Sequence, residues 1–137
     1  MTDVELIEFH DARLLQLAIT PRDSKVLLSF EDVSVYCRAS TAETFEVWSY
    51  TANVALSLPT RLVIEGALPG DGWIIDDKLE GLGAERPDWR KCLSAPVRVQ
   101  SLTLAFNNGA TLVCGESLLR LTLLERKRLR ETWRGPL

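Results

Sequence analysis

Apolar and polar residues alternate along much of the chain, which predicts strands with one buried and one solvent-facing side. A helix would instead distribute such residues around its whole circumference. Shorter alternations predict further strands at residues 15–20, 33–38 and 119–123. The clearest alternation covers residues 48–58, where the apolar positions are Trp48, Tyr50, Ala52, Val54, Leu56 and Leu58.

Residues typical of turns separate the expected strands. Asn107-Asn108-Gly109 stands between the apolar runs 97–106 and 110–114, and Asn and Gly tolerate the positive φ angles of tight hairpin turns. The segments 20–24 and 69–72 combine Pro with Asp, Ser or Gly and predict two further turns.

The run 97–106 changes phase in its middle. Its apolar residues occupy odd positions at Val97 and Val99, and even positions from Leu102 onward. A β-bulge near Gln100-Ser101 would return them to one face, because one extra residue reverses the alternation. A strand buried on both faces would also accommodate the pattern.

The composition favours one globular domain. The chain has 137 residues, of which 46% are hydrophobic and 26% charged, so a proper core is feasible without disulfides. We expect about nine or ten strands, and their short connections favour antiparallel pairing over helical crossovers. The segment 81–96 is the exception, and we expect a loop there with at most a helical turn. The predicted fold is a mainly antiparallel all-β sandwich or open barrel spanning residues 1–137.

The end of the chain, residues 125–137, is a basic tail. Leu129 and Trp133 are four residues apart, which suits a short C-terminal helix docked by both side chains. Leu129, Glu131 and Trp133 would equally share one face of a strand. Both alternatives stay open at this point.

Charge is distributed unevenly. The net charge is −3, but residues 125–134 hold five bases and two acids, so the remainder sums to −6. Residues 65–90 hold seven acids against three bases. A solvated acidic loop would explain this segment, and so would a docking patch for a basic partner. Aromatic residues ringed by charge are typical of binding hot spots. The candidate partner-binding residues are therefore Asp71, Trp73, Asp76, Asp77, Glu80, Glu85, Asp88 and Trp89.

Motifs for chemistry are missing from the sequence. It has no nucleophile elbow, paired-cysteine zinc motif, calcium-binding loop or glycine-rich phosphate loop, so we expect no catalytic activity, metal or cofactor. His10 stands beside Asp11, but neighbours on a strand point to opposite faces. Cys92 follows Arg90 and Lys91, which predicts the most reactive thiol, whereas Cys37 and Cys114 are expected in the core.

The sequence also disfavours a secreted, a membrane-spanning and a nucleic-acid-binding protein. The first ten residues contain three acids and no base, unlike a signal peptide, and no apolar stretch approaches the roughly 20 residues of a membrane span. The three scattered cysteines suit a reducing compartment, so we expect a cytoplasmic protein. Nucleic-acid binding is not expected, because the sequence pI is about 5.2 and the basic surface is small.

Two stretches carry a resemblance. Residues 9–17 with the following turn and 25–30 are similar to the start of many small bacterial β-rich proteins, and residues 102–124 are similar to their closing hairpin. Several such proteins look like immunity proteins encoded beside polymorphic or contact-dependent toxins. The resemblance covers about a third of the chain and implies a protein that neutralises a toxin by binding it, without assigning binding residues.

Three other functions compete with this one. A small-ligand carrier would have its pocket near Trp73 and Trp89, at the end of the sandwich. An enzyme would use His10. A structural subunit or homo-oligomer would pair through an exposed strand edge.

Overall fold

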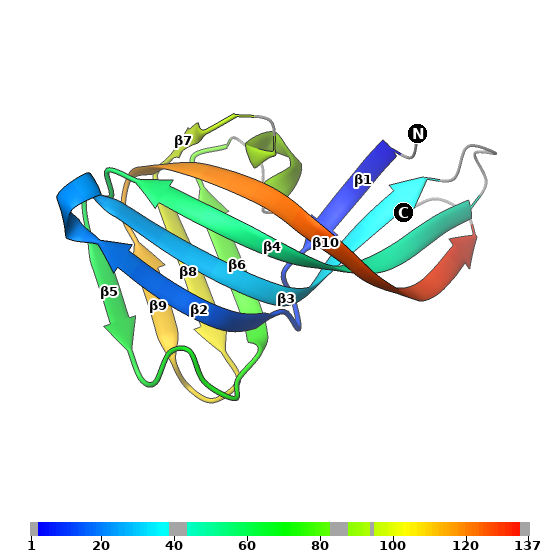
Figure 1. Cartoon of the computed structure of the whole chain (residues 1–137), viewed down its shortest axis with the longest axis horizontal. Helices are drawn as coiled ribbons and strands as arrows, with labels where there is room; N and C mark the ends of the chain where they lie inside the picture. Colours follow the sequence, from blue (N-terminus) through cyan, green and yellow to red (C-terminus); the bar gives the residue numbers. More distant parts are fainter. Residues whose placement is uncertain (1–2, 39–43, 83–87, 94, 135–137) are drawn as a thin grey trace.

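The computed structural model describes residues 3–38, 44–82, 88–93 and 95–134, and it is an all-β structure (Figure 1). In chain order its elements are β1 (Asp3–Glu8), β2 (Arg13–Thr20), the 3-10 turn η1 (Pro21–Asp23), β3 (Lys25–Arg38), β4 (Thr44–Ser57), β5 (Leu62–Glu65), β6 (Ile74–Glu80), the 3-10 turn η2 (Trp89–Cys92), β7 (Val97–Val99), β8 (Ser101–Phe106), β9 (Thr111–Cys114) and β10 (Ser117–Arg134).

The strands form two antiparallel sheets, which confirms the predicted fold class. Sheet A has the order β1-β3-β4-β10-β7, with β2 also paired to β3, and sheet B has the order β5-β9-β8-β6. The strands of the two sheets cross steeply in Figure 1. Backbone hydrogen bonds join them at one corner, where Asp11 donates to Ile74 O and Ile74 donates to Ala12 O, both at 2.8 Å.

The core lies between the sheets and is filled by large side chains. Trp89 on η2 is buried against Phe9, with ring centroids 4.2 Å apart, and Phe9 meets Phe30 edge-on at 5.1 Å. The other fully buried large residues in this core are Leu28, Leu56, Ile74, Leu102, Leu104, Leu112, Leu119 and Leu121. The alternation predicted in 48–58 is confirmed at Ala52, Val54 and Leu56, which are buried, whereas Leu58 lies past the end of β4 and is exposed. At the start of the run both sides are covered: Trp48 and Tyr50 are half-buried against the core, and Ser49 on the opposite side is buried.

A bulge keeps β3 facing the core along its whole length. The buried apolar residues are even-numbered up to Phe30 and odd-numbered from Val33, and the pairing with β4 shifts between these two positions. Asp32 supplies the extra residue with φ of +59°. Its carboxylate accepts a hydrogen bond of 3.0 Å from the buried Ser49 hydroxyl, which satisfies a polar group on the outer side of the sheet.

Two expectations about strand faces were wrong. Leu15 and Ile19 were expected to face the core, but both are about half exposed. β2 is an edge strand with a register shift between Leu14 and Gln16, so Leu14 is buried in place of Leu15, and of the expected residues Leu17 packs against the core.

The phase change in 97–106 has a third explanation. The chain leaves sheet A after β7, turns at Gln100 and enters sheet B as β8. It is therefore neither a bulge within one strand nor a strand buried on both faces, because the two halves belong to different sheets. The hairpin predicted at Asn107-Asn108-Gly109 is confirmed between β8 and β9, and Gly109 has φ of +88°.

The basic tail continues β10 as a strand, so of the two alternatives for residues 125–134 the strand is confirmed and the short helix is wrong. These residues pair with β4. Together with β1 and residues 33–38 and 44–50, they form a projection beyond sheet B, which we call the arm (Figure 1).

The arm has an apolar cluster of its own. Phe45 and Val47 are buried, although they lie on the face of sheet A opposite the main core. The Arg38 guanidinium covers the Phe45 ring at 4.3 Å from its centroid and pairs with Glu5 at 3.0 Å. Packing on both faces favours a well-defined arm over a free ribbon.

Candidate functional site

The predicted acidic and aromatic residues differ in their exposure to solvent. Trp89 is 1% exposed, so it belongs to the core and offers no ring to a partner. Asp77 is half-buried and accepts a hydrogen bond of 2.9 Å from Trp89 Nε1. Burial raises the pKa of Asp77 above its ordinary value, the Trp89 hydrogen bond lowers it, and the charges of Asp76 and Glu8 raise it further.

Some of the other acidic residues take part in ion pairs. Asp76 and Glu80 lie in exposed positions on β6, and Glu80 is 3.4 Å from Lys78. Asp88 pairs with Arg90 at 3.2 Å. These ion pairs neutralise part of the negative charge that the sequence concentrates in this segment.

Asp71 and Trp73 lie before β6, near the β8–β9 turn. Asp71 is exposed, and Trp73 is 43% exposed with its backbone N–H bonded to Asn107 Oδ1 at 2.8 Å. Glu85 lies outside the described residues.

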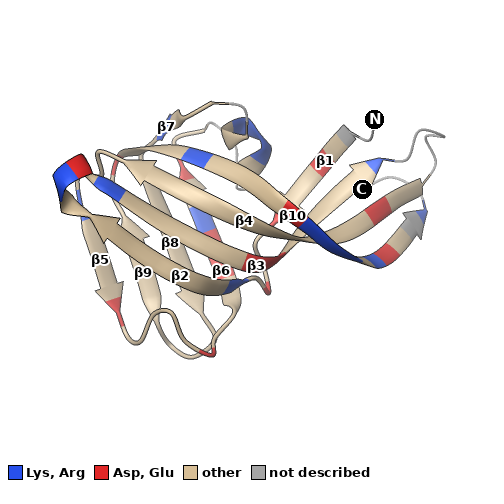
Figure 2. Ribbon diagram, in the orientation of Figure 1, with Lys and Arg blue, Asp and Glu red and all other residues tan. Residues whose placement is uncertain are grey.

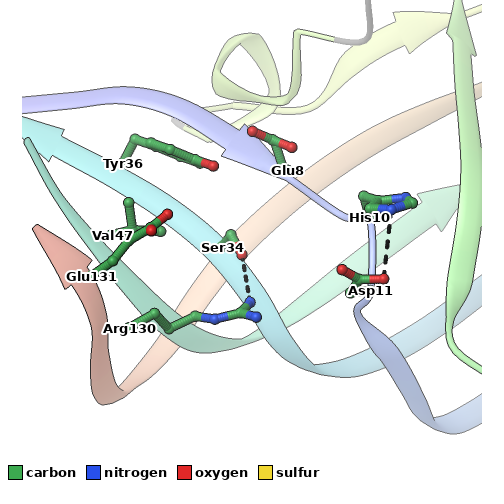
Figure 3. A pocket seen from close by; sticks show the side chains of 8 residues that line it. All are labelled: Glu8, His10, Asp11, Ser34, Tyr36, Val47, Arg130 and Glu131. Atoms are coloured by element: carbon green, nitrogen blue, oxygen red, sulfur yellow. Dashed lines mark hydrogen bonds and ion pairs between the residues drawn. The ribbon is translucent and has the colours of Figure 1, made fainter. Parts of the chain in front are cut away.

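A different group of polar residues does converge, at the root of the arm. They line a cavity of about 380 Å³, which we call the arm pocket, and Figure 3 shows their side chains reaching toward it from separate segments. The lining residues are Glu8 from β1, His10 and Asp11 from the β1–β2 turn, Ser34 and Tyr36 from β3, Val47 from β4, and Arg130 and Glu131 from β10.

Bulges in β10 bring Arg130 and Glu131 to the same pocket. Neighbouring residues on a regular strand point to opposite faces, but here the pairing with β4 shifts between Leu129 and Glu131. Two further shifts of the pairing lie at Leu124 and Lys127, each of which is an extra residue in β10. Residues 118–134 therefore pair with the shorter segment 44–57. Each bulge adds one residue, increases the local twist and redirects side chains.

The electrostatics of the arm pocket favour a cationic guest. Three carboxylates (Glu8, Asp11 and Glu131) face one guanidinium (Arg130), which gives −2 if His10 is neutral. Figure 2 shows acidic positions of the ribbon beside the basic stretch of β10.

Two hydroxyl groups in the pocket are fixed by their surroundings. Arg130 Nη1 donates a hydrogen bond of 2.8 Å to Ser34 Oγ. Burial, assisted by the Glu8 carboxylate, raises the pKa of Tyr36 to about 12. Tyr36 therefore keeps its proton at neutral pH and remains a hydrogen-bond donor.

The pocket does not assemble a nucleophilic centre. Ser34 Oγ contacts a cation, whereas an activated nucleophile needs an adjacent base. His10 Nε2 lies 3.6 Å from Asp11 Oδ1, with both side chains more than half exposed. The turn thus lets these neighbours approach each other, contrary to the expectation for a strand, but at the solvent surface.

The expected reactivity of Cys92 is wrong. Its side chain is fully buried, and burial raises the pKa of the thiol to about 11. The cations of Arg90 and Lys91 are exposed and do not offset this burial. In the described part of the chain, no group of three or more His, Cys, Asp or Glu residues is arranged to hold a metal ion.

Comparison with protein-family profiles, with curated protein sequences and with solved structures found no match. Across the described residues, no helix has the length and apolar character needed to cross a membrane.

Among the residues of the arm pocket, the sequence singled out only His10 and its neighbour Asp11 as candidates for chemistry. Ser34 and Tyr36 could have been noticed only because they lie on the polar side of the strand predicted at residues 33–38. Arg130 and Glu131 were visible only as part of a basic tail, because no local pattern revealed the bulge between them and Leu129.

Proposed function

We propose that this chain is a non-enzymatic protein-binding module whose arm pocket receives an arginine or lysine side chain of the partner. The observation that supports it is the convergence of Glu8, Asp11 and Glu131 on one cavity from three separate segments. Carboxylates grouped in a partly enclosed space bind guanidinium or ammonium groups through charge-assisted hydrogen bonds.

The edge of the arm favours contact through side chains over strand addition. Beyond Leu119, the side of β10 away from β4 pairs with no other described strand. Three register shifts interrupt this edge, and it carries Arg126, Lys127 and Arg128. Bulges and charged side chains are the features with which proteins prevent edge-to-edge pairing.

The acidic pocket and the resemblance to immunity proteins together suggest the class of partner. Toxins that act on nucleic acids carry basic clefts, and a negatively lined pocket would be steered toward such a surface. We therefore propose a bacterial toxin domain as the partner, with the chain acting in the cytoplasm of the cell that it protects.

The guanidinium site can be tested without the partner. The probe is N-acetylarginine amide, followed by amide chemical shifts in NMR, and the neutral isostere N-acetylcitrulline amide is the control. We expect arginine-specific shifts at β1 and at residues 128–132. Loss of one carboxylate in Glu8→Gln or Glu131→Gln should weaken binding about fivefold, which is about 1 kcal/mol. Glu65→Gln, at an exposed position on β5, should not change it.

The protein-level test uses affinity capture from the source cells. A partner captured by the wild-type chain should be retained by Glu65→Lys and lost by the pair Glu8→Lys and Glu131→Lys. Co-expression of that partner should then be toxic only with the double variant. Equal arginine and citrulline binding, or capture indifferent to the arm variants, would contradict the proposal.

A further inference from the structure

The end of the sandwich opposite the arm carries a groove of different chemistry. It has a volume of about 310 Å³ and lies where the β2–β3 turn with η1 meets the β4–β5 connection, at the left of Figure 1. We call it the end groove. Its lining residues are Ile19, Thr20, Pro21, Ser24, Lys25, Val26, Pro59, Thr60, Arg61 and Leu62.

One part of this lining is apolar and accessible. Ile19 is 52% exposed although it belongs to an alternating apolar pattern, and Val26 and Leu62 connect the groove to the core. Pro21 and Pro59 complete the apolar walls. Such a surface favours an aliphatic group that would otherwise be hydrated.

The charged part of the lining is only positive. Lys25 and Arg61 line the groove, and no carboxylate does, in a chain with 19 acids and 16 bases. Neither cation has an ion-pair partner among the described residues. Asp23, on η1, is a neighbour in the chain but does not line the groove.

A backbone hydrogen bond joins the two segments that line the groove. Ser24 and Leu58 have φ of +50° and +55°, a region that bulky L-residues rarely adopt. The Leu58 N–H donates a hydrogen bond of 2.8 Å to Ser24 O, so the two strained residues join the β2–β3 turn to the β4–β5 connection. Strain of this kind persists where the surroundings impose it, and it concentrates at ligand sites. A preformed groove reduces the ordering that binding would require.

We infer that the end groove binds a small amphipathic carboxylate. Its aliphatic body would lie over Ile19, Val26 and Leu62, and its carboxylate would meet the cations of Lys25 and Arg61, with the Thr60 hydroxyl as a further donor. The volume of about 310 Å³ suits a small molecule, since ligand pockets span roughly 300–1,000 Å³. This site shares no residue with the arm pocket, so either proposal can fail alone.

The test separates the contribution of the ligand's aliphatic chain from that of its charge. Sodium octanoate is titrated below its micellar concentration and followed by amide chemical shifts. Sodium acetate supplies the carboxylate without the octyl chain, and octyltrimethylammonium supplies an octyl chain with the opposite charge. We expect saturable shifts at residues 19–26 and 58–62 with octanoate, and binding at least about tenfold weaker for the two controls.

Variants assign the binding to the named residues. The pair Lys25→Gln and Arg61→Gln should weaken octanoate binding about tenfold, and Ile19→Ser should weaken it about threefold. Arg120→Gln, an exposed position on β10, is the matched control and should have no effect, and circular dichroism verifies that each variant is folded. Equal binding of octanoate and octyltrimethylammonium, shifts outside these segments, or indifference to both sets of variants would overturn the inference.

Discussion

The hydrogen bond between Asp77 and Trp89 offers the sharpest test of how the core is built. Trp89 is 1% exposed, so its indole N–H cannot turn to water if the carboxylate at 2.9 Å is removed. Asp77→Leu therefore leaves a buried donor without a partner. An unsatisfied buried polar group costs about 1–3 kcal/mol, and we expect the free energy of unfolding to fall by that amount.

A double-mutant cycle isolates the pair. Trp89→Phe removes the donor and leaves the Asp77 carboxylate half-buried without it, so this change is also destabilising. The combined variant lacks both polar groups and should cost less than the sum of the two single changes by about 1–2 kcal/mol. Urea unfolding followed by far-ultraviolet circular dichroism gives the free energies of unfolding of the wild type, the two single variants and the combined variant. Additive costs, or an Asp77→Leu cost under about 0.5 kcal/mol, would refute the assignment.

The same residue predicts a pH dependence. Burial raises the pKa of Asp77 above its ordinary value of 3.8, so the folded state takes up this proton at a higher pH than the unfolded state. Wild-type stability therefore gains from Asp77 as the pH falls through the folded-state pKa toward 3.8. Asp77→Asn keeps an acceptor for Trp89 but cannot titrate. Relative to the wild type, it should be more stable at neutral pH and lose that advantage on acidification, and an advantage independent of pH would contradict the raised pKa.

Two further predictions concern the backbone and the thiols. Gly81→Ala should cost at least about 2 kcal/mol, because its φ is +103° and a Cβ would lie 2.7 Å from Gln100 N; Gly109→Ala, with φ of +88° and no atom within 4 Å, should cost only about 1 kcal/mol in the same urea experiment. Cys92, fully buried with a thiol pKa near 11, should not react with a disulfide reagent at pH 8 in the time that the urea-unfolded chain reacts completely, and a rapid native reaction would show that the site opens.

Most of the strands could be predicted from the sequence. Alternation is a local pattern, and burial of one side of a strand imprints it on consecutive residues, as in residues 48–56. The β8–β9 turn was equally local, because Asn107-Asn108-Gly109 supplies its own tolerance for positive φ.

Which strands pair with each other could not be predicted from the sequence. Val97–Val99 and Ser101–Phe106 join different sheets, yet nothing in the residues around Gln100 distinguishes a change of sheet from a bulge. The inward direction of Asp77 was hidden for a similar reason, since its stabilising donor lies 12 residues away.

The arm and its pocket depended on tertiary structure alone. A helix makes its backbone hydrogen bonds within its own segment, whereas a strand obtains them from another part of the chain. The basic tail could therefore be assigned as a strand only through its pairing with β4, and the bulges of that pairing turn Arg130 and Glu131 toward one cavity. The sequence by itself determined that most of the chain forms strands with one buried side, because that information is held by neighbours; the joining of distant strands decided where the polar side chains meet.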